Sequence, residues 1–256
     1  AQKSGSEASR KHSDWVTVET LYSGISRGTE SLVFHGRVPK TEYERMRAPF
    51  QEGDFPSPVK YGYANVGRVV DGPAELLGQT VFCLYPHQDR FAVPDSAMIP
   101  LPASVSDEDA VFLASMETAL GIVHDAAPRL GEVVALFGCG VIGLLTAVLL
   151  QRAGARVVAV EPAALRRRTA TELGCIGIDP STESVTERIR EVTTGRGADI
   201  AINTSAGDAG LQTAIDVADD FGCRPYTKQR LEKLERALES TFQNDHNKQS
   251  GIADFM

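Results

Sequence analysis

The sequence predicts an α/β protein in which an irregular β-barrel is followed by a parallel sheet covered by helices. In residues 15–102, short β-branched runs are separated by prolines and glycines, a pattern typical of short strands joined by turns. From residue 133 onward, apolar strand patterns alternate with helical patterns. That alternation predicts parallel strands joined by right-handed helical crossovers.

The first half should build its barrel from short strands at residues 16–21, 66–70 and 80–84. A helix should follow, because Ser106 is a good N-cap and Asp109 stands three residues later, as in a capping box. We expect this helix to run without a break from Ser106 to about residue 127, where Pro128 stops it.

The second half is expected to supply the parallel sheet. Its first strand is apolar throughout, as a strand buried on both faces requires. The predicted strands are residues 133–137, 157–160, 176–178 and 199–202, and the predicted helices are residues 141–153, 163–173, 183–194 and 209–218.

A glycine motif of the form GxGxxG occupies residues 138–143, between the first predicted strand and its helix. Gly138 permits a tight turn, Gly140 lets a pyrophosphate approach the backbone, and Gly143 lets the helix pack closely on the strand. A buried strand before the motif and a helix after it make the match specific. The sequence therefore predicts a dinucleotide-binding Rossmann unit.

Val141 and Ile142 open the helix whose unpaired N–H groups would face the phosphates. Glu161 ends the second strand, where a carboxylate can accept the ribose hydroxyls and repel a 2′-phosphate. This favours NAD over NADP. The arginines at residues 166–168 leave an alternative open, because an arginine just beyond this strand can bind a 2′-phosphate; otherwise they form a solvated helix face.

Composition narrows the classes of partner. The 256 residues carry a net charge of −8, which argues against nucleic acid and anionic membranes as partners. No apolar stretch is long enough to span a bilayer, and no signal peptide opens the chain, so we expect a cytoplasmic protein that binds a small-molecule substrate. The four scattered cysteines are expected to be buried or incidental thiols.

Several further segments occur together in the order that one enzyme family uses: residues 24–30, 35–39, 62–67, 101–102, 106–108 and 118–120. On these segments the chain resembles the medium-chain dehydrogenase/reductase superfamily, in its zinc-alcohol-dehydrogenase-like branch near the bacteriochlorophyllide dehydrogenase-like members. The resemblance covers roughly residues 16–218. It implies a GroES-like barrel beside the Rossmann domain, an active site in the cleft between them, and hydride transfer between a nicotinamide and an alcohol or carbonyl.

The resemblance also implies where a catalytic zinc would be held. Zinc-bearing members have a cysteine where this chain has Ser26, a His-Glu pair where it has Tyr63 and Ala64, and a third ligand near Ala114. None of these positions keeps a zinc ligand, and the lobe that carries a structural zinc is missing. We therefore expect no bound metal.

A zinc-free site must polarise a carbonyl through hydrogen bonds. The resemblance makes Ser26, Thr29 and Tyr63 the candidate donors, with Glu30 as an acid or orienting group. The alternatives are that the two hydroxyls only cap a turn, that Tyr63 is a packing aromatic, and that Glu30 forms a surface ion pair with a neighbouring arginine. His87 is expected to be a loop or packing histidine.

For the cofactor, the resemblance places Arg27 at the pyrophosphate and Thr118 beside the nicotinamide pocket. Asn203, Thr204 and Ser205 match the loop that follows strand four and runs beside the cofactor.

After residue 218 the sequence departs from the family. We expect strands in the order 3-2-1-4, without the family's next two strands, and strand four as an edge. An amphipathic helix at residues 226–242 and that edge suggest a homo-oligomer and a poor catalyst. The predicted divisions are a disordered start (1–14), a GroES-like domain (15–105), an NAD-binding domain (106–221) and a helical tail (222–256).

Two functions remain open. The leading hypothesis is a zinc-independent oxidoreductase that uses NAD on small alcohols or carbonyls. The alternative is a truncated, non-catalytic nucleotide-binding or interaction protein, because a fold alone does not decide function.

Overall fold

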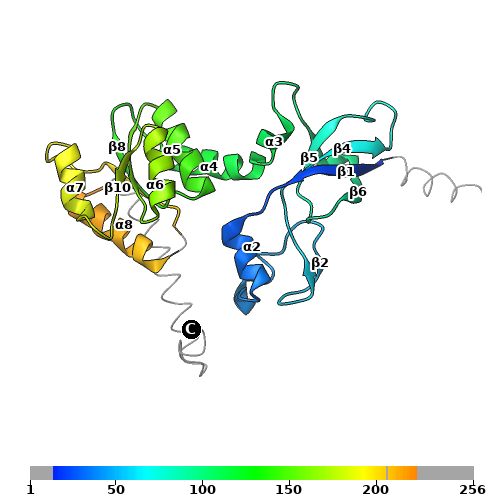
Figure 1. Cartoon of the computed structure of the whole chain (residues 1–256), viewed down its shortest axis with the longest axis horizontal. Coiled ribbons are helices and arrows are strands. Elements are labelled where there is room, and N and C mark those ends of the chain that lie inside the picture. The colour runs from blue at the N-terminus through cyan, green and yellow to red at the C-terminus, as the bar shows by residue number, and fades with distance from the viewer. Residues whose placement is uncertain (1–13, 206, 224–256) are drawn as a thin grey trace, which may run out of the picture. The chain divides into compact units, whose positions relative to one another are not determined.

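The computed structural model describes residues 14–205 and 207–223. The chain divides into two compact units, Ala1–Ala114 and Ser115–Met256. Figure 1 shows unit 1 as a β-rich body and unit 2 as a sheet flanked by helices. None of the helices in the described residues combines the length and apolarity that crossing a bilayer requires.

Unit 1 is built on a curled antiparallel sheet with the strand order β6-β1-β4-β5-β7. The predicted strands at 16–21, 66–70 and 80–84 are confirmed, with small shifts at their ends. The strands are β1 (Trp15–Ser23), β4 (Asn65–Asp71), β5 (Thr80–Cys83), β6 (Arg90–Pro94) and β7 (Met98–Pro100), and a two-stranded ribbon joins β2 (Glu52–Gly53) to β3 (Val59–Lys60).

The core of unit 1 follows from the alternation along these strands. Val16 and Val18 on β1 are buried with Val69 on β4 and Val81 on β5. Burying a side chain of this size stabilises the fold by about 1.5–3 kcal/mol. The sheet face that these residues cover is therefore an apolar core of this unit.

The helical segments of unit 1 differ from the prediction. Two 3₁₀ turns, η1 (Lys40–Glu42) and η2 (Asp95–Ala97), and the helix α2 (Arg27–Phe34) were not predicted. The single helix predicted from Ser106 is wrong in one respect, because it is divided into α3 (Asp107–Ala110) and α4 (Leu113–Ala126).

The break between α3 and α4 has a local cause. The Ser106 hydroxyl accepts the Asp109 backbone N–H at 3.1 Å, as the capping prediction required. The Phe112 backbone N–H then bonds the Asp109 carbonyl at 3.0 Å, a tight turn that interrupts the helical pattern. Ala110 is buried against Val66 and Phe82 of unit 1, so tertiary packing sets the end of α3.

Unit 2 holds a parallel sheet in the order β10-β9-β8-β11, which is the predicted order 3-2-1-4. Its strands are β8 (Val133–Phe137), β9 (Arg156–Val160), β10 (Ile176–Ile178) and β11 (Ile200–Asn203), and its helices after α4 are α5 (Val141–Arg152), α6 (Ala164–Glu172), α7 (Val185–Val192) and α8 (Asp208–Phe221). Within the described residues β11 is an edge strand.

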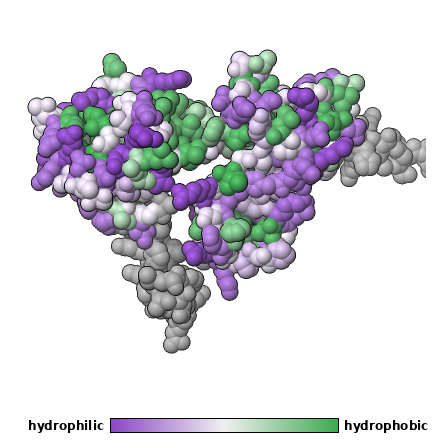
Figure 2. Space-filling model, viewed as in Figure 1, coloured by the Kyte–Doolittle hydropathy of each residue, from purple (hydrophilic) through white to green (hydrophobic). Residues whose placement is uncertain are grey.

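Helices cover both faces of this sheet. One apolar core joins the sheet to α7 and α8 through residues such as Ile189 and Ala214, and the other joins it to α4, α5 and α6 through residues such as Val123 and Leu150. The surface that Figure 2 shows mixes polar and apolar side chains. The tail helix predicted at 226–242 lies outside the described residues.

Candidate functional site

The glycine turn joins β8 to α5, and its three glycines meet different requirements. Gly138 has φ of +93°, and a Cβ there would lie 2.7 Å from the Ser205 backbone nitrogen. A Cβ on Gly143 would lie 2.1 Å from the Gly138 carbonyl oxygen. A Cβ on Gly140 would meet no atom within 4 Å. Two glycines therefore close the turn on itself, and the third leaves open space beside the backbone.

That open space lies at the start of α5, where Gly140 is the N-cap. The first N–H groups of a helix, here those of Val141 and Ile142, have no partner within the helix. The helix dipole makes the same end favourable for negative charge. The open side of Gly140 and these donors fit a pyrophosphate, so the residues present suit a dinucleotide.

Glu161 follows β9 and is held by the protein itself. Its two carboxylate oxygens accept the backbone N–H of Cys139 at 2.8 Å and that of Ala163 at 2.9 Å. The Arg166 guanidinium bonds the same carboxylate at 2.7 Å. With 2% of its surface exposed, Glu161 ties the glycine turn to the segment after β9.

Burial alone would raise the pKa of Glu161. The Cys139 N–H, the Arg166 guanidinium and the Ala163 N–H outweigh that effect and hold the pKa below its usual range. The Arg166 Nε atom is buried and has no partner in the described residues. This unpaired donor beside Glu161 suits a further polar group such as a ribose hydroxyl or a phosphate oxygen.

The segment after β11 forms hydrogen bonds with the glycine turn, which follows the neighbouring strand β8. The Thr204 hydroxyl donates to the Gly138 carbonyl at 2.8 Å, and the Thr204 N–H bonds the Phe137 carbonyl at 2.8 Å. The Ser205 hydroxyl bonds Asn203 Oδ1 at 2.6 Å. The cofactor residues predicted in this segment therefore lie directly beside the predicted turn.

Two predicted cofactor residues lie on helices other than α5. Arg27 is the exposed first residue of α2 in unit 1. Thr118 is exposed on α4 in unit 2.

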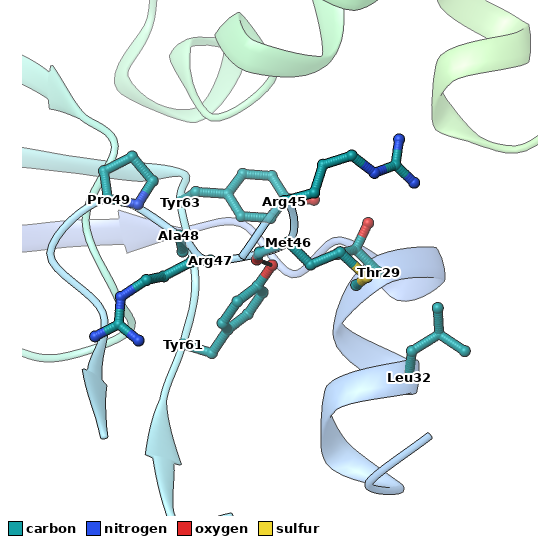
Figure 3. A pocket seen from close by; sticks show the side chains of 9 residues that line it. All are labelled: Thr29, Leu32, Arg45, Met46, Arg47, Ala48, Pro49, Tyr61 and Tyr63. Atoms are coloured by element: carbon teal, nitrogen blue, oxygen red, sulfur yellow. Dashed lines mark hydrogen bonds between the residues drawn. The ribbon is translucent and has the colours of Figure 1, made fainter. Parts of the chain in front are cut away.

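Unit 1 contains a hollow of about 460 Å³, which Figure 3 shows from close by. It brings two of the predicted catalytic residues, Thr29 and Tyr63, together with Tyr61, which the sequence reasoning overlooked. The lining residues are Thr29, Leu32, Arg45, Met46, Arg47, Ala48, Pro49, Tyr61 and Tyr63.

The two tyrosines of this hollow make different contacts. The Tyr61 hydroxyl donates to the Met46 carbonyl at 2.7 Å. Burial, the neighbouring Tyr63 and the charge of Glu30 raise the pKa of Tyr61 to about 12. Tyr61 is therefore held as a neutral phenol, while the Tyr63 ring packs edge-on against it with centroids 6.1 Å apart.

Glu30 and Ser26 are not among the residues that line the hollow. Ser26 is the N-cap of α2, and its backbone N–H donates to Glu30 Oε1 at 2.7 Å. The other carboxylate oxygen of Glu30 bonds His87 Nε2 at 2.6 Å, so its partner is a histidine and not an arginine. The opposite ring nitrogen, His87 Nδ1, lies 2.5 Å from the Ser23 hydroxyl.

The sequence reasoning missed this group of three side chains. Ser23 ends β1, Glu30 lies in the first turn of α2, and His87 lies in the loop between β5 and β6. A histidine in a loop between two short strands was the available signal, because functional side chains concentrate on loops held by a rigid scaffold.

The positions implied for a catalytic zinc hold Ser26, Tyr63 and Ala114. Within residues 14–205 and 207–223, no group of three or more His, Cys, Asp or Glu side chains could hold a metal ion. A catalytic zinc takes about three such ligands. The described residues therefore do not fit a zinc ion, and no chemical step is assigned to one.

The buried thiols include Cys139 inside the glycine turn, which is 1% exposed. Burial, together with the nearby Glu161 charge, raises its pKa to about 12. The four cysteines are free and buried, as the sequence predicted.

Comparison with known proteins gives one family match and several similar chains. The zinc-binding dehydrogenase family matches residues 141–226. The (R,R)-butanediol dehydrogenase of Bacillus subtilis is 36% identical over 126 residues, which are 48% of this chain and 36% of that enzyme. A putative zinc-binding dehydrogenase from Sinorhizobium meliloti, solved with NADP, superposes with a TM-score of 0.64 at 23% identity, covering 80% of this chain and 66% of that one.

A short stretch of the chain is similar to a protein that is not a dehydrogenase. The DNA polymerase II large subunit of Haloarcula marismortui is 74% identical over 46 residues, which are 18% of this chain and 3% of the polymerase subunit. This chain thus spans about a third of the butanediol dehydrogenase and a very small part of the polymerase subunit. The family match and the butanediol dehydrogenase similarity each cover less than half of this chain, and the solved dehydrogenase shares its fold.

Proposed function

We propose that the chain is a nicotinamide-dependent oxidoreductase of small alcohols or carbonyl compounds that works without a bound zinc. The observation that carries this proposal is the glycine turn. Gly138 and Gly143 have no room for a side chain, yet Gly140 faces open space at the start of α5. The similarity to a butanediol dehydrogenase supports the reaction class. The resemblance of residues 24–30, 35–39 and 62–67 favours the bacteriochlorophyllide dehydrogenase-like branch.

A bound nicotinamide would supply or accept the hydride. The chain's own part would be to hold the dinucleotide at residues 138–143 and to bind the substrate oxygen in unit 1. Thr29 and Tyr63 line the hollow there and carry hydroxyl groups that can donate to a carbonyl oxygen. Such donors would replace the polarising effect of a metal.

The cofactor is proposed to be NAD in preference to NADP. The Glu161 carboxylate is buried at the end of β9, where its charge disfavours a 2′-phosphate. Arg166 already pairs with that carboxylate, so its guanidinium is partly neutralised as a phosphate site. The unpaired Arg166 Nε atom remains for a ribose hydroxyl.

Titration of the purified chain with NADH and NADPH tests this proposal. We expect NADH to bind about ten-fold or more tightly, since 1.4 kcal/mol of charge repulsion corresponds to that factor. In Glu161→Ala the preference should shrink, with Glu172→Ala on the exposed face of α6 as the matched control. Equal affinities of the wild type for both cofactors would contradict the preference. Binding of neither would reject the oxidoreductase, whereas binding without any hydride transfer would favour the non-catalytic nucleotide-binding alternative.

Zinc content is the second test. We expect the purified chain to contain far less than one zinc ion per molecule, and chelators to leave its melting temperature unchanged. The reason is that the donors found at the implied positions do not gather into a ligand set. Elemental analysis checks the content, and a stoichiometric zinc would contradict the zinc-free mechanism.

A further inference from the structure

Three side chains of unit 1 form one continuous chain of hydrogen bonds outside the lining of the hollow. The Ser23 hydroxyl lies 2.5 Å from His87 Nδ1, and His87 Nε2 lies 2.6 Å from Glu30 Oε2. The two contacts use both ring nitrogens. They join residues that are 64 and 57 positions apart along the sequence. Tertiary structure, not local chain geometry, brings them together.

The surroundings hold this group in one orientation. The Ser26 backbone N–H donates to the second oxygen of Glu30 and so fixes the carboxylate from its far side. Gly62 packs against the imidazole, and a Cβ there would lie 2.9 Å from the His87 backbone nitrogen and 3.0 Å from Nε2. The His87 N–H also bonds the Tyr61 carbonyl at 3.1 Å. The Glu30 end and the central imidazole are thus anchored to the framework.

Chemistry assigns the direction of these bonds. A carboxylate can only accept, so in a neutral imidazole Nε2 carries the proton toward Glu30 and Nδ1 accepts the Ser23 hydroxyl proton. The Glu30 side chain is 13% exposed and the His87 side chain 32% exposed. The pair is therefore largely shielded from water but not sealed from it.

The Glu30 end lies next to the hollow. Its chain neighbour Thr29 and the flanking Tyr61 both line that space, and the Glu30 charge acts on the Tyr61 phenol. We propose that Ser23, His87 and Glu30 form a proton relay that delivers the substrate proton during carbonyl reduction and removes it during alcohol oxidation. This proposal rests on the oxidoreductase function proposed above.

In reduction, a bound nicotinamide would supply the hydride to the carbonyl carbon. The proton on His87 Nε2 passes through the Glu30 carboxylate to the substrate oxygen, and Nδ1 takes the Ser23 hydroxyl proton, which leaves the imidazole neutral in its other tautomer. Water then restores the Ser23 proton and leaves as hydroxide. Oxidation runs the same transfers backwards. Within this relay Glu30 is the member next in sequence to Thr29, which lines the hollow, and His87 and Ser23 are positioning and proton-carrying residues.

A purely structural role for the trio makes a different prediction from a relay. If the three side chains only hold β1, α2 and the β5–β6 loop together, their replacement would affect folding and KM. It would not change the solvent deuterium isotope effect on kcat. The experiment therefore compares wild type, His87→Gln, Glu30→Gln and Ser23→Ala, with 2,3-butanediol and its ketone as probe substrates. His35→Gln is the matched control, because that histidine lies in the same unit and its ring, within the described residues, bonds the carbonyl and hydroxyl oxygens of Ser31.

For the relay we expect His87→Gln and Glu30→Gln to lower kcat about 100-fold or more, the usual range for lost acid–base catalysis, while NADH affinity stays the same. Ser23→Ala should lower kcat less, because water can replace the hydroxyl. The solvent deuterium isotope effect should change in all three variants. In a further variant, His87→Ala, added imidazole should restore part of the activity. His35→Gln should behave as wild type.

Unchanged kcat and an unchanged isotope effect in His87→Gln, with intact NADH binding, would overturn the relay and leave the oxidoreductase proposal standing. If wild type binds NADH but transfers hydride to neither probe, both proposals are contradicted. If it binds no NADH, the oxidoreductase proposal fails, and proton–nitrogen NMR of the His87 ring then decides the relay separately. Ring protons that exchange freely with water would reject it, and slowly exchanging ones would support the hydrogen-bonded trio.

Discussion

Replacing Gly140 with valine is expected to abolish NADH binding while the chain stays folded. The added side chain meets no protein atom within 4 Å, and Gly140 has an extended backbone with φ of −72°, which other residues adopt without strain. The valine would instead occupy the open space beside the first turn of α5, where the pyrophosphate must approach. We expect at least a 100-fold loss of affinity, measured by fluorescence titration.

Two further variants make this result interpretable. Gly121→Val places the same side chain in open space on α4 and should keep wild-type affinity. Gly143→Ala should damage the fold instead, because its Cβ would lie 2.1 Å from the Gly138 carbonyl, and a clash of this kind costs about 1–3 kcal/mol or more. Normal NADH affinity in a folded Gly140→Val chain would show that the turn is not the cofactor site.

Glu161→Gln is expected to destabilise the chain at neutral pH and to flatten its response to acid. The folded-state pKa of Glu161 lies below its ordinary value, so its stabilising contribution is present above about pH 4.5 and is lost as the pH falls through the folded-state pKa. Glutamine cannot provide a charged acceptor to the Cys139 N–H and the Arg166 guanidinium. We expect a loss of about 2 kcal/mol at pH 7, since Arg166 is partly exposed and solvent weakens its share.

Urea unfolding at pH 7 and pH 3 checks this expectation. The difference between wild type and Glu161→Gln should be large at pH 7 and smaller at pH 3, because the contribution is lost as the pH falls through the lowered folded-state pKa of Glu161. Glu172→Gln, whose partner Arg168 is 3.6 Å away on an exposed surface, should match wild type at both pH values. A constant difference between wild type and Glu161→Gln across this range would mean that the charge of Glu161 contributes nothing to stability.

The parallel sheet could be predicted from the sequence because the features that indicate it lie in neighbouring residues. The strand Val133–Phe137 is apolar at every position and buried at every position, and the glycine motif follows it at once. Both features are readable without knowledge of the rest of the chain. The tight packing at Gly143 likewise follows from the known geometry of such turns.

The missed features depend on contacts between distant residues. Helix α2 has one buried residue, Val33, so it carries no apolar stripe that could reveal it. The pairing of Glu30 with His87 likewise leaves no periodic signal, and nothing in the sequence shows that the Glu30 carboxylate bonds the Ser26 N–H. The continuous helix predicted from Ser106 failed because packing of Ala110 in unit 1 overrides helix-forming preference.

The position of Cys139 has a consequence for redox chemistry. A thiol inside a phosphate-binding turn could make the site sensitive to oxidants, since the thiolate is the form that reacts. Here the sulfur is buried, and its pKa of about 12 leaves it protonated at every physiological pH. Peroxide and alkylating reagents should therefore leave the dinucleotide site intact in the folded chain. The occupancy of the site by a nicotinamide would then depend on the concentration of that cofactor and not on the oxidation state of the protein's own sulfur.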